Sequence, residues 1–107
     1  MVDASLRPLM YGYLRLDLIE GDVAEWDAKV VEFAEAAGFD LATVFHESDT
    51  GSVVPAEFMS MIRELRRSRA SAVAIPEGHL RGMATPQICL LDLLHTRALT
   101  TVWEMAA

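Results

Sequence analysis

Apolar and polar residues follow one another along the chain in a pattern typical of strands that alternate with helices. Four apolar segments of five or six residues, each bounded by glycine, proline or polar residues, predict β-strands. Between them, three longer segments carry apolar residues every three or four positions, which is the spacing of one helix face. The predicted strands are residues 11–16, 41–45, 71–75 and 99–103, and the predicted helices are residues 22–37, 55–69 and 87–97.

The first predicted helix has the clearest boundaries. Asp22 and Glu25 are spaced as in a capping box, which satisfies the free N–H groups at a helix start. Gly38 suits the left-handed position that follows many helices, and Phe39 can supply the hydrophobic contact that accompanies it. The apolar stripe between these ends consists of Trp26, Val30, Phe33, Ala34 and Ala37.

The starts of the other two helices are marked by proline. Pro55 fits the first helical turn, where its missing N–H costs nothing. Thr85 and Pro86 predict an N-cap residue and the first helical residue of the third helix. The polar segment 46–52 between the second strand and the second helix is expected to be a loop.

Strands that alternate with helices predict right-handed crossovers and a parallel sheet. We expect one three-layer α/β domain over residues 1–107, with a four-stranded parallel sheet in the order 2-1-3-4 and a flexible segment at residues 1–9. The length of 107 residues fits a single domain. A hydrophobic content of 52% with 23% charged residues excludes an intrinsically disordered chain.

The net charge of −7 argues against nucleic acid as the main partner, because non-specific affinity for phosphates comes from Lys and Arg. The charge is uneven: residues 1–54 carry 11 acids and three bases, whereas residues 55–107 carry five acids and six arginines. Four of these arginines gather near the end of the second predicted helix. They either compensate the negative end of the helix dipole or form a polyanion-binding patch that associates with DNA. These residues are Arg63, Arg66, Arg67 and Arg69.

Cys89 is the only cysteine, so the chain cannot form an internal disulfide bond. Its apolar neighbours predict a buried, unreactive thiol. The N-terminal residues lack the charged start and apolar run of a secretory signal, and no apolar segment is long enough to span a membrane. We therefore expect a cytoplasmic protein without membrane contact.

Charged and polar side chains follow the first and third predicted strands. Parallel sheets bind ligands at the carboxyl ends of their strands, beside the point where the strand order reverses. Here that edge carries Arg15, Asp17, Glu77 and His79. An arginine buried in a sheet needs a carboxylate, and Asp17 is two residues away. The cluster is either a structural ion pair or, with Arg81 as a fifth candidate residue, a site for an anion, a small ligand or a substrate. No spacing of ligands predicts a metal, and no motif predicts a cofactor.

Four segments resemble the catalytic domain of the serine recombinases, the family of resolvases and invertases. Residues 11–17 (YGYLRLD) are similar to the family's first strand, of the form Y-x-R-[VL]-S. Residues 35–39 (EAAGF) resemble its ALxAAG segment. Residues 45–52 (FHESDTGS) resemble its F-x-D/E-x-x-S-G loop, and residues 73–81 (VAIPEGHLR) fall where the family has a strand followed by LDRLxR. The resemblance implies a resolvase-like fold.

The resemblance also implies lost chemistry. The family's serine nucleophile falls at Asp17, and a carboxylate there would repel the DNA phosphate that a hydroxyl attacks. The family's arginine clamp is incomplete as well. Arg15 matches, but aligning His79 with the first arginine of DRLxR places Gly78 at the aspartate and Gly82 at the last arginine. Arg81 could replace that arginine only with a shift of one residue.

The family's long dimer helix and DNA-binding region would follow the fourth strand, beyond these residues. We therefore expect a pseudoenzyme without catalytic residues, acting through a homodimer or a protein partner as a regulatory or accessory factor. The fourth strand or helix 87–97 would form the interface. Adaptable apolar surface is expected from Met59, Met61, Leu80, Met83, Trp103 and Met105.

Overall fold

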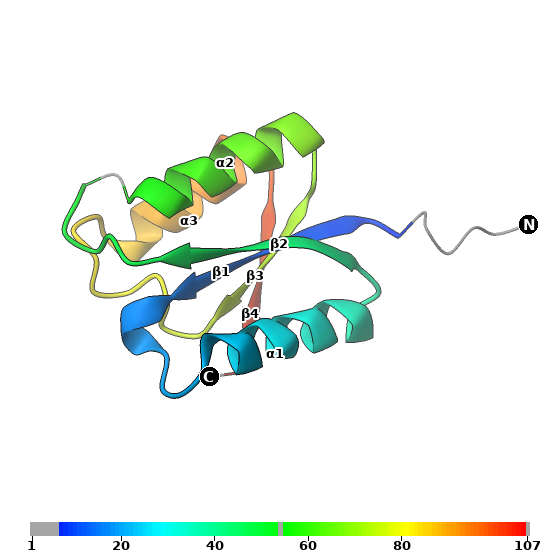
Figure 1. Ribbon diagram of the computed structural model, residues 1–107. Coiled ribbons are helices and arrows are strands. Elements are labelled where there is room, and N and C mark those ends of the chain that lie inside the picture. Colours follow the sequence, from blue (N-terminus) through cyan, green and yellow to red (C-terminus); the bar gives the residue numbers. More distant parts are fainter. Residues whose placement is uncertain (1–6, 54, 107) are drawn as a thin grey trace, which may run out of the picture.

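A computed structural model describes residues 7–53 and 55–106 and has an α/β fold (Figure 1). Its four strands form one parallel sheet in the order β2-β1-β3-β4, which confirms the predicted topology. In chain order the elements are β1 (Leu9–Arg15), the 3-10 turn η2 (Leu16–Leu18), α1 (Val23–Ala36), β2 (Asp40–Glu47), α2 (Ala56–Ser68), β3 (Ala72–Pro76), α3 (Gln87–Thr96) and β4 (Thr101–Met105). Of the segment expected to be flexible, residues 1–6 lie outside the described residues, whereas Leu9 already belongs to β1.

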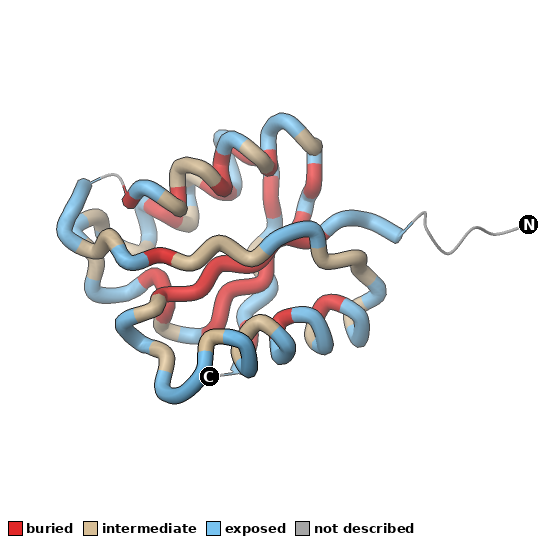
Figure 2. The backbone as a smooth tube through the Cα atoms, in the orientation of Figure 1, coloured by how far each residue is buried: buried red, intermediate tan, exposed pale blue. Residues whose placement is uncertain are grey.

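The three layers follow from the direction of the crossovers. The chain moves across the sheet in one direction from β1 to β2, and in the opposite direction from β2 to β3 and from β3 to β4. Right-handed crossovers therefore place α1 on one face and α2 and α3 on the other (Figure 1). Each face has its own buried core, because successive side chains of a strand point to opposite faces. Figure 2 shows β1 and β3 as the buried centre of the sheet.

Gly12 lets α1 approach the sheet closely. A Cβ atom at this position would lie 2.9 Å from Cγ1 of Val30 on α1 and 3.1 Å from Cγ2 of Val44 on β2. The register between β1 and β2 also shifts between Met10 and Gly12. Gly12 is therefore required by packing, although it lies inside a strand, where glycine is otherwise unfavourable.

The predicted ends of α1 are confirmed. The Asp22 side chain accepts a hydrogen bond from the Ala24 N–H at 3.0 Å. Gly38 has a φ of +88°, and the N–H groups of Gly38 and Phe39 bond to the carbonyls of Glu35 and Ala34. This pair of bonds defines a Schellman motif, which satisfies the last carbonyls of the helix.

Other predicted boundaries are wrong by one or two residues. His46 and Glu47, expected in a loop, complete β2, because their backbone pairs with β1. Pro86 and not Thr85 is the N-cap of α3, since the Thr85 hydroxyl instead donates to the Val53 carbonyl. β4 begins at Thr101 rather than Leu99, whose φ of +50° is incompatible with a strand.

The apolar surface differs from the prediction. Met61, Leu80 and Met105 are buried in the two cores, and Met59 and Met83 pack against one of them, whereas Trp103 is 38% exposed. The prediction of a buried thiol is also wrong. Cys89 is exposed. The sequence does not indicate this, because apolar residues occur on nearly every side of α3 and do not specify which face is buried.

Within the described residues, none of the helices has the length and apolar character needed to cross a membrane.

Candidate functional site

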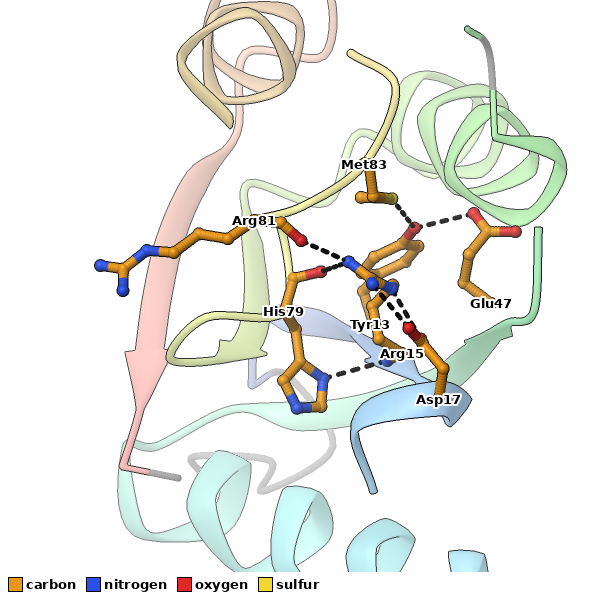
Figure 3. Close-up of polar contacts among 7 residues, drawn as sticks. All are labelled: Tyr13, Arg15, Asp17, Glu47, His79, Arg81 and Met83. Atoms are coloured by element: carbon orange, nitrogen blue, oxygen red, sulfur yellow. Dashed lines mark hydrogen bonds and ion pairs between the residues drawn. The ribbon is translucent and has the colours of Figure 1, made fainter. Parts of the chain in front are cut away.

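Arg15 lies at the carboxyl end of β1 and is almost completely buried, with 4% of its side chain exposed. Its Nε and Nη2 donate to the two carboxylate oxygens of Asp17, each at 2.8 Å. Its Nη1 donates to the carbonyls of His79 at 3.2 Å and Arg81 at 2.7 Å (Figure 3). Four of the five guanidinium N–H groups therefore have protein acceptors, as a buried cation requires.

His79 lies in the segment that follows β3, and it bonds to the backbone of β1. Its Nδ1 accepts a hydrogen bond from the Arg15 backbone N–H at 3.0 Å. This contact assigns the neutral tautomer with its proton on Nε2. Burial, and next the charge of Arg15, lower the pKa of His79 below its usual value. His79 thus acts as a neutral acceptor for the Arg15 N–H, which lies at the carboxyl end of β1 and has no acceptor in the sheet.

Asp17 lies in η2, and its side chain is 46% exposed. The bidentate hydrogen bond from Arg15 is the main cause that lowers the pKa of Asp17. The predicted Arg15–Asp17 pair is confirmed. The two residues do not share a strand face, however, because the 3-10 turn carries Asp17 back over the arginine.

The other two residues predicted for this edge do not join the cluster through their side chains. Glu77 is exposed, and its backbone N–H bonds to the Met105 carbonyl at 2.8 Å. Arg81 contributes only its carbonyl oxygen, and Figure 3 shows its guanidinium pointing away from Arg15. Of the five candidate residues, the structure brings together Arg15 and the side chains of Asp17 and His79.

A second polar pair next to this cluster was not predicted from the sequence. The Tyr13 hydroxyl donates to Oε1 of Glu47 at 2.7 Å and lies 3.9 Å from the sulfur of Met83 (Figure 3). Glu47 is fully buried, and it also accepts hydrogen bonds from the N–H groups of Phe58 at 2.9 Å and Glu57 at 3.2 Å. Burial, and next the hydrogen bond to Glu47, raise the pKa of Tyr13.

Glu47 therefore caps α2 from a neighbouring strand. The N-cap residue of α2 is Pro55, whose side chain cannot accept a hydrogen bond. The first N–H groups of the helix need an acceptor, and a carboxylate suits the positive end of the helix dipole. The sequence does hold one signal for this pair: the N-cap position of α2 lacks Ser, Thr, Asp or Asn, so the helix needs an acceptor from elsewhere in the chain.

The four arginines of the predicted patch have different surroundings. Arg67 bonds to the Glu64 carboxylate at 2.7 Å, and this hydrogen bond lowers the pKa of Glu64. Arg63 bonds to the Ser60 hydroxyl at 3.2 Å. Arg66 and Arg69 instead line a cavity. Only Arg66 and Arg69 of the four line this cavity.

The chemistry available to the Arg15 cluster is limited by its own hydrogen bonds. An anion could reach the guanidinium only by displacing Asp17, which already neutralises it. In residues 7–53 and 55–106, no group of three or more His, Cys, Asp or Glu side chains is arranged to hold a metal ion. No protein family, curated protein or solved structure matches the chain. The similarity to serine recombinases therefore stays a prediction.

Proposed function

We propose that the chain is a non-catalytic, resolvase-like domain that acts through protein–protein contacts, with a second copy of itself as partner. The closed Arg15 cluster supports the non-catalytic part of this proposal. Asp17 occupies the position expected for a nucleophile, and both of its oxygens bond to Arg15. A phosphodiester would meet a carboxylate in place of a hydroxyl and an arginine without free access, so neither attack nor charge stabilisation is favoured.

The proposed protein–protein contact rests on an apolar groove between α3 and β4, which we call the α3–β4 surface. The groove has a volume of about 450 Å³. Ile88 at its rim is 75% exposed, although a side chain of this size is usually buried. The lining residues are Ile88, Leu91, Asp92, His95, Thr101 and Val102.

The groove lies beside an open sheet edge. β4 pairs only with β3, and its outer edge has no strand partner within the described part of the chain. The N–H and C=O groups of such an edge form a template for another strand. The opposite edge strand, β2, ends in the buried Glu47. The α3–β4 surface therefore combines backbone groups with apolar side chains.

The polar residues of the α3–β4 surface favour a second copy as the occupant. Asp92 and His95 lie three residues apart on α3, so both face the groove. A twofold axis places the same surface on both partners, so that each residue contacts its counterpart's neighbour reciprocally. Antiparallel α3 helices would place Asp92 of each copy against His95 of the other. The groove thus complements itself in hydrogen-bonding groups as well as in apolarity, because a carboxylate can accept a hydrogen bond from an imidazole N–H.

Sedimentation equilibrium of the chain and of Ile88→Asp tests this proposal. We expect a concentration-dependent dimer. Burying one such side chain contributes about 1.5–3 kcal/mol, and a twofold interface counts it twice, so the substitution should weaken dimerisation by about two to four orders of magnitude. Val31→Asp is the matched control, because Val31 is an exposed residue of α1 on the other face of the sheet.

A wild-type chain that stays monomeric at millimolar concentration would overturn the choice of partner. Equal weakening by Ile88→Asp and Val31→Asp would overturn the choice of surface. The cytoplasm, which was expected from the sequence, stays the proposed location and can be tested by cell fractionation.

A further inference from the structure

A second cavity lies at the edge of the sheet opposite the Arg15 cluster, where α2 and α3 end before β3 and β4 begin. Its volume is about 460 Å³, which is within the range of small-molecule sites. Three arginines from two distant segments line it: Arg66 and Arg69 at the end of α2, and Arg97 at the end of α3. The sequence patch had suggested the first two, whereas Arg97 joins them only through the fold.

These three guanidinium groups differ from the other arginines of the same region. Arg67 pairs with Glu64, and Arg63 bonds to Ser60. Among residues 7–53 and 55–106, no carboxylate lies within ion-pair distance of Arg66, Arg69 or Arg97. The lining of the cavity contains no acidic residue either. The cavity therefore concentrates positive charge in a chain with a net charge of −7.

The helix ends do not account for this charge. Each helix C-terminus carries the equivalent of about −0.5 elementary charge, so α2 and α3 together contribute about −1 against three arginines. The last carbonyls of α3 also have backbone partners, because Leu93 accepts from Arg97 and Ala98, and Leu94 accepts from Thr100. About two positive charges remain without a neutralising partner in the cavity.

The cavity also has an apolar part. Leu65, Ala70 and Ala98 are buried and form its interior, whereas Leu99 is 79% exposed at its rim. Leu99 has a φ of +50°, in the left-handed region that favours glycine. The combination of exposed guanidinium groups and an apolar wall suits a ligand that is itself part charged and part apolar.

We propose that this cavity binds a small organic anion that carries two or more negative charges and an apolar body. Arg side chains present forked donors that match phosphate and carboxylate groups equally well, so either group can supply the charge. A concave site of this size with an apolar wall fits a small molecule better than the extended backbone of DNA. The lining of this cavity shares no residue with the α3–β4 surface.

Calorimetric titration with phenyl phosphate tests the proposal, and inorganic phosphate and phthalate serve as companion probes. We expect phenyl phosphate to bind more tightly than inorganic phosphate, because only the former can contact the apolar wall. Comparing phenyl phosphate with phthalate identifies the preferred charged group. Arg66→Gln, Arg69→Gln and Arg97→Gln should each weaken binding about tenfold, the effect of losing one charge-assisted hydrogen bond.

Arg63→Gln is the matched control, because Arg63 lies on α2 outside the cavity and should leave the affinity unchanged. Circular dichroism confirms that each variant is folded. The proposal is overturned if no probe binds at about 10 mM or if Arg63→Gln weakens binding as much as Arg66→Gln. Short duplex DNA that binds more tightly than phenyl phosphate, with losses in all four variants, would favour a polyanion patch instead.

Discussion

Replacing Glu47 tests whether one buried carboxylate holds β1, β2 and α2 together. Glu47→Ala removes the acceptor of the Tyr13 hydroxyl and of the Phe58 and Glu57 N–H groups. The first two donors are buried, and each buried donor without an acceptor costs about 1–3 kcal/mol. Relief of the buried charge offsets part of this loss, so we expect about 2–4 kcal/mol of destabilisation. That is a large part of the roughly 5–15 kcal/mol typical of native proteins.

Milder variants make the test measurable even if Glu47→Ala does not fold. Glu47→Gln keeps the shape and one acceptor oxygen, but its amide group would face an N–H donor of α2. We expect a loss of about 1–2 kcal/mol. Tyr13→Phe removes one donor and should also cost about 1–2 kcal/mol. Because Glu47→Ala leaves the Tyr13 hydroxyl without an acceptor, the double variant should be less destabilised than the sum of the single variants.

Urea unfolding followed by tryptophan fluorescence and circular dichroism gives these free energies. The fluorescence comes from Trp26 beside the α1 layer and Trp103 on β4, whereas circular dichroism follows the secondary structure of the whole chain. Coincident transitions by fluorescence and circular dichroism would therefore also indicate two-state unfolding. A destabilisation of Glu47→Ala below about 1 kcal/mol would refute the capping role. Strict additivity of Tyr13→Phe and Glu47→Ala would refute the coupling between the two side chains.

Two further predictions concern the sheet edge and the sheet face. The pKa of His79 is lowered in the folded chain, so the unfolded chain binds the proton at a higher pH than the folded chain does. The free energy of unfolding should therefore fall as the pH drops below about 6.5. His79→Asn keeps an acceptor for the Arg15 N–H and should flatten this dependence in urea titrations between pH 7 and 5; an unchanged slope would contradict it. Gly12→Ala should cost about 1–3 kcal/mol through contact with Val30, whereas Gly51→Ala, in open space, should change the thermal midpoint little; similar midpoints for both would disprove the close approach.

The candidate site could be predicted where its residues are close in sequence or follow neighbouring strands. Arg15 and Asp17 are two residues apart, so the need of a buried arginine for a carboxylate identified the pair directly. His79 was correctly placed at the same edge by the strand order. Glu77 was predicted there for the same reason, whereas Arg81 was suggested by the resemblance to the recombinase clamp. Strand order determines the edge at which a residue lies, but it does not determine the direction of its side chain.

The sequence by itself determined the alternation of strands and helices, the parallel sheet and its order, and the capped ends of α1. These features depend on local periodicity, on capping residues and on the handedness of crossovers, all of which act over short stretches of chain. Only the tertiary structure decided which polar groups meet: Glu47 with α2, and Arg97 with Arg66 and Arg69. Such meetings depend on packing between elements far apart in the chain. The same packing selects the buried face of α3, whose apolar residues occur on every side.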